Sequence, residues 1–368
     1  MDRPIRVLIV DDSSLARHRL STIISAAPGF EVAGFASNHH ECLTLLHSLQ
    51  PDAITLDVQM PTVDGITTLR MIMEQRPTPV LMVSSLTESG AKTTVEALAL
   101  GAVDYIAKPA VPWRQGTAFG DELIGKLSVI AKARARAATR HIKTATTTER
   151  DVTTQPSEPP ASPAVHAAQS DNTPLVVIGS STGGPQALDQ LFASLPNVLP
   201  AAFLVVQHMP PLFTKSLAAR LGRITHMPAR EAEEGDAVKA GNVLVAPGGF
   251  HMVVGQDKLL HLDQLPPIHG VRPAIDRMLF SVADHWSGPC LVVILTGMGS
   301  DGTEGARRLH ARGVEILAQD ETTSIVYGMP RSVAEAGLAK AILPLDMLSL
   351  AIEQWIAVAH IAITGSGI

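Results

Sequence analysis

Three residues that could perform nucleophilic catalysis lie far apart in the second half of the sequence. Ser181 stands in the run GSSTGG, His208 in VVQHMPP and Asp301 in ILTGMGSDG. A serine hydroxyl is a weak nucleophile at neutral pH and needs a base within hydrogen-bond reach, which an imidazole can supply. A carboxylate can orient that imidazole and stabilise it once it is charged. The three residue types therefore indicate a serine hydrolase, provided that the fold brings them together.

Each of these residues also has a simpler interpretation. The glycine-rich run around Ser181 could cradle a nucleotide phosphate, and Ser180 offers a second hydroxyl beside it. An isolated histidine such as His208 is most often an ordinary core or surface group, and Asp301 could cap the helix predicted in GTEGARRLHARG. The glycines around Met298 would leave backbone N–H groups free to bind an oxyanion. The presence of all three residue types at the ends of predicted strands favours hydrolysis over these separate interpretations.

Five residues in the first half could perform phosphoryl transfer. They are three carboxylates, a hydroxyl and an ammonium group: Asp11, Asp12, Asp57, Ser84 and Lys108. Oxygen-rich clusters suit Mg²⁺, and a bound cation offsets the repulsion between neighbouring carboxylates. In such a site Asp57 attacks the phosphorus atom, the metal and Lys108 neutralise the phosphoryl oxygens, and Ser84 donates to one of them. The alternative is that each aspartate merely caps a helix.

Short apolar runs typical of buried strands precede these residues. The first half contains RVLIV, EVAGFA, AITLDV, VLMVSS and DYIAKP, and the second contains LVVIGSS, AFLVVQHM, NVLVAPG, CLVVILTGMG and EILAQD. Strands that alternate with helical patterns predict a parallel sheet covered on both faces. In such sheets functional groups gather beyond the carboxyl ends of the strands. We therefore predict an α/β fold with two doubly wound parallel-sheet domains.

A change in composition separates the two α/β halves. From residue 131 to residue 172 the apolar periodicity disappears, and Thr, Ser, Pro and Ala dominate, although the run KARARAATR could extend the preceding helix. We predict a first domain over residues 1–126, a flexible linker over 127–172 and a second domain over 173–368.

The composition argues against several classes of protein. With 46% apolar and 17% charged residues the chain is not disordered throughout, and a net charge of −6 argues against nucleic acid as a partner. The run GxxxxGK[ST] of a nucleotide-dependent transferase is missing. Cys42 and Cys290 form no metal-binding motif and suit a reducing compartment. No apolar run approaches the roughly 20 residues of a bilayer span, so we predict a cytoplasmic protein without membrane insertion.

The motifs of the first half occur together in one known family. The acidic pair Asp11-Asp12, the run DVQMP that begins at Asp57, and the residues Ser84 and Lys108 match in type and order, and residues 5–126 thus resemble a response-regulator receiver domain. The resemblance implies that Asp57 accepts a phosphoryl group from a histidine kinase, with Mg²⁺ bound by the three aspartates. It also places Tyr105 at the position of the switch aromatic, and Ser85 is the alternative to Ser84 as the hydroxyl.

The motifs of the second half also occur together in one family. GSSTGG, QHMP, TGMGSDG and QDETTSIVYGMP all match, and residues 173–365 resemble the catalytic domain of the chemotaxis protein-glutamate methylesterases. The resemblance implies that Ser181 is the nucleophile, His208 the base and Asp301 the acid. It also implies that the backbone of Met298 binds the oxyanion and that Thr182 is auxiliary. Ser180 stands where an alanine is usual. A further stretch with His269 and Arg272 resembles the rim of the active site.

The two resemblances imply a flavodoxin-like fold for the first domain and a Rossmann-like fold for the second. Together they imply a regulated hydrolase. Its substrate would be a glutamate γ-methyl ester on methyl-accepting chemoreceptors, cleaved without a cofactor, and deamidation of glutamine side chains would be a second activity. The unphosphorylated first domain would cover the catalytic residues, and phosphorylation of Asp57 would uncover them.

Overall fold

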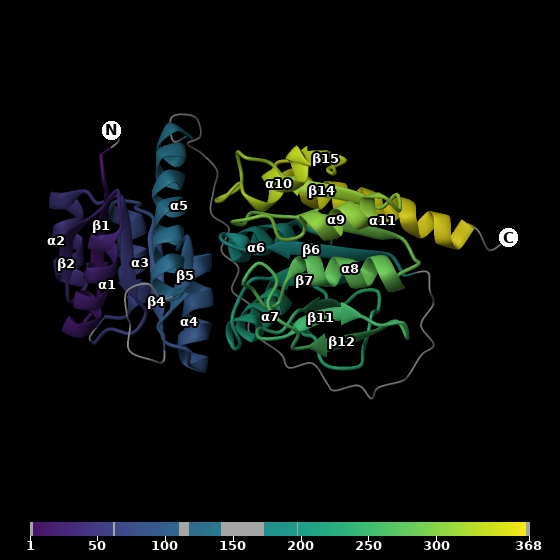
Figure 1. Ribbon diagram of the computed structural model, residues 1–368, viewed down its shortest axis with the longest axis horizontal. Helices are drawn as coiled ribbons and strands as arrows, with labels where there is room; N and C mark the ends of the chain where they lie inside the picture. The colour runs from purple at the N-terminus through teal and green to yellow at the C-terminus, as the bar shows by residue number, and fades with distance from the viewer. Residues whose placement is uncertain (1–2, 62, 110–117, 141–172, 197, 366–368) are drawn as a thin grey trace.

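Two parallel sheets with helices on both faces make up the structure (Figure 1). It is a computed structural model that describes residues 3–61, 63–109, 118–140, 173–196 and 198–365. The fold class predicted from the strand patterns is therefore confirmed. Most of the predicted linker, residues 141–172, lies outside the described residues.

The first sheet has the strand order β2-β1-β3-β4-β5, with all neighbours parallel. Its elements are β1 (Ile5–Val10), α1 (Ser14–Ala26), β2 (Phe30–Ala36), α2 (His39–Leu49), β3 (Ala53–Asp57), α3 (Gly65–Gln75), β4 (Val80–Ser84), α4 (Glu88–Ala99), β5 (Asp104–Ala107) and α5 (Ala118–Arg140). Every residue of β3 and β4 is buried, which explains their unbroken apolar sequences. Of the predicted phosphoryl-transfer residues, Asp57 and Ser84 end β3 and β4. Asp11 and Asp12 follow β1, and Lys108 follows β5.

Helix α5 continues beyond the predicted domain boundary at residue 126. Leu123, Leu127 and Ile130 of this helix are buried with α1 on one face of the first sheet, while α2, α3 and α4 cover the other face. The apolar spacing of these three residues puts them on one side of a helix. The first domain therefore extends beyond residue 126, and the run KARARAATR forms the end of α5.

The second sheet has the order β15-β14-β13-β6-β7-β10-β8, with all neighbours parallel. Its elements are β6 (Leu175–Ser180), α6 (Gly184–Ser194), β7 (Ala202–Gln207), α7 (Phe213–Ile224), β8 (Ala229–Glu231), β10 (Val243–Val245), α8 (Ile275–His285), β13 (Cys290–Ile294), α9 (Thr303–His310), β14 (Glu315–Gln319), α10 (Met329–Glu335), β15 (Ala341–Leu343) and α11 (Leu345–Gly365). The order reverses at β6, which lies between β7 and β13. Such a switch point is where doubly wound sheets bind ligands.

A small antiparallel sheet was not predicted from the sequence. It has the order β11-β12-β9 and consists of β9 (Asp236–Ala237), β11 (His251–Val254) and β12 (Leu259–Asp263). Met252, Val254 and Leu260 pack into the core beneath α8. The sheet therefore supports the helix whose first turn reaches the predicted catalytic residues.

Helix α11 contradicts the expectation that no apolar run approaches the length of a bilayer span. The 19 residues Leu345–Ile363 are long and apolar enough to cross a membrane, and 28% of that window is buried. Leu348, Ile352 and Ile356 pack into the core beside α6. Length and composition alone are weak evidence for a span, because a core helix passes the same test.

The two domains pack directly against each other. Helix α4 of the first domain lies against α6 and α7 of the second, and their buried side chains belong to one apolar cluster (Figure 1). The ring of Tyr105 stacks on Phe213 with centroids 4.6 Å apart. Gln186 Nε2 donates to the carbonyl oxygens of Leu98 and Ala102 at 2.8 and 2.6 Å. Each domain therefore contributes polar and apolar groups to the interface.

Candidate active site

The backbone around Ser181 forms a sharp corner between β6 and α6. Gly183 adopts a positive φ of 76°, and a Cβ on Gly184 would lie 2.0 Å from Gln207 Oε1. Both positions therefore require glycine. Pro185 lies in the first turn of α6, where its missing N–H costs nothing. The glycine-rich run thus serves the close packing of strand, helix and neighbouring strand.

Ser180 and Ser181 point to different surroundings. The hydroxyl of Ser180 is buried and donates to Gln207 Oε1 at 2.6 Å. The amide of Gln207 in turn donates to the backbone carbonyl of Ser181 at 2.9 Å. Only Ser181 of the two serines lines the cavity at this edge of the sheet. Ser180 therefore supports the corner, while Ser181 is the accessible hydroxyl.

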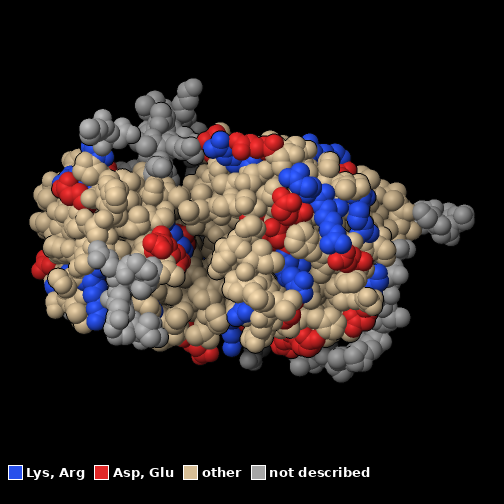
Figure 2. Space-filling view, in the orientation of Figure 1, with Lys and Arg blue, Asp and Glu red and all other residues tan. Residues whose placement is uncertain are grey.

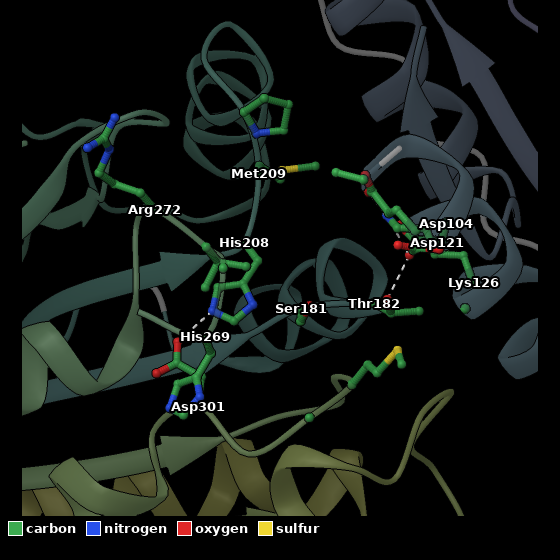
Figure 3. A pocket seen from close by; sticks show the side chains of 18 of the residues that line it. Asp104, Asp121, Lys126, Ser181, Thr182, His208, Met209, His269, Arg272 and Asp301 are labelled. Carbon is green, nitrogen blue, oxygen red and sulfur yellow. Dashed lines mark hydrogen bonds and ion pairs between the residues drawn. The ribbon is translucent and has the colours of Figure 1, made fainter. Parts of the chain in front are cut away.

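His208 and Asp301 form a tight pair at the same edge. His208 Nε2 lies 2.7 Å from Asp301 Oδ2, and both side chains are almost buried (Figure 3). His208 follows β7, and its backbone N–H donates to the carbonyl of Ser180, which sets the imidazole beside the corner. With Nε2 donating to the carboxylate, Nδ1 is the ring nitrogen left to accept a proton.

The carboxylate of Asp301 sits at the beginning of α8. It accepts hydrogen bonds from the backbone N–H groups of Ile275 at 2.7 Å and Asp276 at 2.9 Å. Burial acts to raise the pKa of Asp301, but the hydrogen bonds from His208 and from these N–H groups outweigh it and lower the pKa. Asp301 does not cap α9, whose N-cap is Gly302 without a side-chain hydrogen bond. The carboxylate of Asp301 is thus held in its ionised form, facing His208.

Ser181 and His208 line one cavity of about 660 Å³ between the two domains. Figure 2 shows a hollow where the domains meet, and Figure 3 shows Ser181 next to the His208–Asp301 pair. Among the described residues no hydrogen bond joins Ser181 to His208. Catalytic hydrogen bonds are often loose before substrate binds. The three predicted residues therefore come together, with the base–acid contact formed and the nucleophile–base contact open.

The turn around Met298 passes close to Ser181. A Cβ on Gly297 would lie 2.8 Å from Ser181 Cβ and 2.3 Å from Met329 Sδ, so the turn can approach only because residue 297 is glycine. Gly299 has a positive φ of 86°, which turns the chain away again. Met298 itself lines the cavity. This arrangement brings the backbone of the turn to the side of the nucleophile.

Thr182 contacts the first domain. Its hydroxyl donates to Asp104 Oδ2 at 2.7 Å, and Lys126 Nζ lies 3.1 Å from the same oxygen (Figure 3). Lys126 also donates to the carbonyl of Tyr105 at 2.6 Å. The residue next to the nucleophile is therefore tied to the strand that carries the predicted switch aromatic.

The two predicted rim residues line the same cavity. His269 lies beside Asp276, with Nε2 3.1 Å from Oδ2, and has a positive φ of 53°. Arg272 donates through Nη1 to the carbonyls of Gln264 and Leu265 at 2.9 and 3.0 Å. The guanidinium of Arg272 points away from Ser181 in Figure 3. Of the two, His269 is directed toward the catalytic acid.

The predicted phosphoryl-transfer residues gather at the edge of the first sheet. Lys108 Nζ lies 2.9 Å from both Asp11 Oδ2 and Asp57 Oδ2. Asp11, Asp12 and Asp57 each offer an oxygen within 4.8 Å of the others, a donor set that fits Mg²⁺. Burial raises the pKa of Asp57 and the charge of Asp11 adds to this, although Lys108 opposes it. A cation would therefore relieve a repulsion that is present in this site.

Two further predicted residues of the first domain are buried. The hydroxyl of Ser84 donates to the carbonyls of Ser85 and Gly90 at 3.3 and 3.4 Å. The ring of Tyr105 is enclosed at the domain interface by Phe213 and Lys126. Ser84 is the last residue of β4, and Tyr105 is the second residue of β5, the strand that pairs with it.

Several site residues have little or no signal in the sequence. Asp104, Lys126, Gln207 and Asp276 were not predicted, since each acts through one side-chain contact that depends on packing between distant elements. Gln207 precedes His208 at the end of a predicted strand, and its position at a strand end is the one feature that could have drawn attention to it.

Comparison with known proteins matches both halves of the chain. Residues 176–352 match the family described as CheB methylesterase, and residues 7–114 match the response regulator receiver domain. The chain is similar to a protein-glutamate methylesterase/protein-glutamine glutaminase of Symbiobacterium thermophilum, with 46% identity over 96% of this chain and 98% of the relative. It is 41% identical to a second such protein from Pseudomonas aeruginosa over 95% of this chain and 97% of the relative.

A third relative shows the same likeness. The chain is 42% identical to the protein-glutamate methylesterase/protein-glutamine glutaminase of Thermotoga maritima, over 93% of this chain and 96% of the relative. Each of these alignments runs through both domains at high identity. The chain therefore belongs to the CheB methylesterase family, in its form with an N-terminal receiver domain.

Proposed function

We propose that this protein hydrolyses glutamate γ-methyl esters on methyl-accepting chemoreceptors. The observation that carries the proposal is the His208–Asp301 contact of 2.7 Å at the cavity edge that also exposes Ser181. The names of the relatives identify the substrate class, since each is a protein-glutamate methylesterase/protein-glutamine glutaminase. A phosphate-binding role for the glycine-rich run is less well supported, because its glycines are used for packing against Gln207 and Ile325.

In the proposed reaction Ser181 Oγ attacks the ester carbonyl carbon while His208 accepts the hydroxyl proton. Asp301 stabilises the resulting imidazolium, and the backbone N–H groups of the Met298 turn bind the oxyanion. The imidazolium then protonates the leaving methoxide, methanol departs, and His208 activates a water that hydrolyses the acyl-enzyme. The same residues would release ammonia from a glutamine side chain, and none of these steps needs a cofactor.

The first domain would regulate this reaction by phosphorylation. A histidine kinase would donate the phosphoryl group to Asp57, while Asp11, Asp12 and Asp57 would hold Mg²⁺ and Lys108 would bind phosphoryl oxygens. Mg²⁺ would supply neutralisation of the negative charge on the phosphoryl oxygens. The receiver match and the oxygen donor set support this assignment.

In the unphosphorylated protein the first domain would act as a lid. Asp104, Tyr105 and Lys126 line the cavity from the receiver side, so a receptor helix could reach Ser181 only after these residues move. Phosphorylation would shift Ser84 and Tyr105, remove the stacking on Phe213 and loosen the interface. The hydrogen bond from Thr182 to Asp104 supports this link between the phosphorylation site and the catalytic residues.

The partners and the compartment follow from this function. The protein would act in the cytoplasm on the cytoplasmic part of a receptor, without nucleic acid and without inserting into the membrane itself. On the face shown in Figure 2, acidic and basic residues are interspersed over the second domain, which suits a protein partner better than a phosphate backbone. Cys42 and Cys290 are buried thiols, as a reducing compartment allows.

A serine-directed fluorophosphonate probe tests the hydrolase assignment. We expect labelling at Ser181 in the wild-type protein and its loss in His208→Ala, because the hydroxyl needs its base. The Gln190→Ala variant is the control, since Gln190 is an exposed residue of α6. Labelling of His208→Ala at the wild-type rate would contradict the assignment.

A further inference from the structure

A second histidine–carboxylate pair lies next to the catalytic one. His269 Nε2 is 3.1 Å from Asp276 Oδ2, and Figure 3 shows His269 beside Asp301 and His208. Asp276 is 1% exposed, whereas the side chain of His269 is 45% exposed and lines the cavity. One ligand atom each of His269, Asp276 and Asp301 lies within 4.8 Å of the others. The two histidine–carboxylate pairs, His208–Asp301 and His269–Asp276, are therefore adjacent.

The backbone and side chain of Asp276 both fix the position of Asp301. The N–H of Asp276 donates to Asp301 Oδ1, and the side chain of Asp276 accepts from the N–H of Gly305 in α9 at 2.7 Å. The first contact holds Asp301 on α8, and the second ties α8 to the helix that follows Asp301 in the chain. Asp276 does not line the cavity, so it would not contact a substrate there, and its route to the His208–Asp301 pair is through Asp301.

Two buried carboxylates at this separation would repel each other without compensation. Burial raises the pKa of Asp276 and the charge of Asp301 adds to this, while hydrogen bonds from Gly305 and His269 oppose it. The titratable groups that act most strongly on this pair are His208, His269 and the two carboxylates themselves. The N–H groups that surround both carboxylates favour their charged forms.

We propose that Asp276, hydrogen-bonded to His269 and Gly305, is a positioning residue of the ester hydrolysis. It fixes Asp301 against His208 and adds a second negative charge behind the imidazolium that forms when Ser181 attacks. His269 is the outer partner that holds the Asp276 carboxylate and carries no proton of the reaction. This inference rests on the proposed function for its chemistry.

The test is the pH dependence of kcat/KM for methanol release by the full chain with phosphodonor present. Asp276→Asn keeps the shape and removes the charge, so we expect the acid limb of the profile to move to lower pH by on the order of half a unit. The plateau value of kcat/KM should fall by about 3-fold, which is the same free-energy change. His269→Gln keeps a neutral donor to Asp276, so its acid limb should not move downward. Asp284→Asn, on the exposed far end of α8, is the matched control and should behave as wild type.

The outcomes separate a positioning role from a structural one. The proposal would be overturned if the plateau value of kcat/KM falls in Asp276→Asn while the acid limb of its pH profile stays at the wild-type position. A structural defect has this effect, because it lowers the rate equally at all pH values. A downward shift in His269→Gln would also overturn it. If Asp276→Asn fails to fold, Asp276→Glu, which retains the charge, takes its place: its acid limb should stay at the wild-type position, and a downward shift would overturn the proposal.

An NMR titration of the His208 imidazole keeps this inference separate from the proposed function. The resonance is assigned by its loss in His208→Ala, and its midpoint is expected to be lower in Asp276→Asn than in wild type and in Asp284→Asn. A wild-type protein that releases no methanol would refute the proposed function, while this titration would still report whether Asp276 acts on His208. Equal midpoints in all three proteins would refute the inference.

Discussion

Gln186 offers a direct test of the closed arrangement of the two domains. Its side-chain amide donates two hydrogen bonds, to the carbonyls of Leu98 and Ala102 in the first domain. Gln186 lies on α6 and does not line the cavity, so its replacement leaves Ser181 and His208 untouched. We expect Gln186→Ala to raise the basal esterase rate because it weakens the interface alone.

The size of the effect follows from the contacts that are lost. A hydrogen bond contributes about 0.5–1.5 kcal/mol net, so the removal of two weakens the closed state by about 1–3 kcal/mol. This corresponds to a shift of about 5–150-fold toward the open state. The basal rate should rise by about 5-fold or more, up to the rate of the phosphorylated protein, where opening no longer limits it.

The assay is the initial rate of methanol release from methyl-labelled receptor without a phosphodonor. Gln190→Ala serves as the matched control, because Gln190 is exposed on the same helix. Thermal unfolding of each variant shows whether the fold is intact. If Gln186→Ala has the basal rate and the melting temperature of wild type, the proposal that the first domain acts as a lid would be refuted.

Three other predictions concern charge and burial. Asp57→Asn should abolish labelling by a small phosphodonor, and Mg²⁺ should raise the melting temperature of wild type more than that of the variant, because one carboxylate ligand is lost; equal shifts would exclude Asp57 from the cation site. Asp301→Asn should lower the free energy of unfolding by about 1–3 kcal/mol at neutral pH in urea titrations. This difference should vanish in acid, since a carboxylate with a lowered folded-state pKa stabilises the fold above its unfolded pKa and loses that effect as the pH falls through the folded-state value; a difference that persists there would contradict it. Burial raises the pKa values of Cys42 and Cys290 to about 12, so neither thiol should react with iodoacetamide near neutral pH in the folded protein, and rapid alkylation would show otherwise.

The strand-end residues were predictable because their strands are unbroken apolar runs. Strands such as β3, β4, β6 and β13 are fully buried, and a parallel sheet places their carboxyl ends at one edge. The types of residue that follow those runs then indicated the chemistry. This is why the sequence alone predicts Ser181, His208 and Asp301 at one edge of the second sheet.

Contacts that depend on domain packing could not be predicted. The hydrogen bond from Thr182 to Asp104 joins residues 78 positions apart on different domains, and no periodicity encodes it. The role of Ser180 as a partner of Gln207 likewise depends on the register of β6 and β7. The short strands of β11-β12-β9 were missed because two to five residues carry little alternation.

The most direct test of the central claim is methanol release by the phosphorylated full chain from methyl-labelled receptor, compared between wild type, Ser180→Ala and Ser181→Ala. The account predicts release by wild type, retained release by Ser180→Ala because that hydroxyl only supports Gln207, and none by Ser181→Ala. Release by Ser181→Ala at a rate near that of wild type would contradict it.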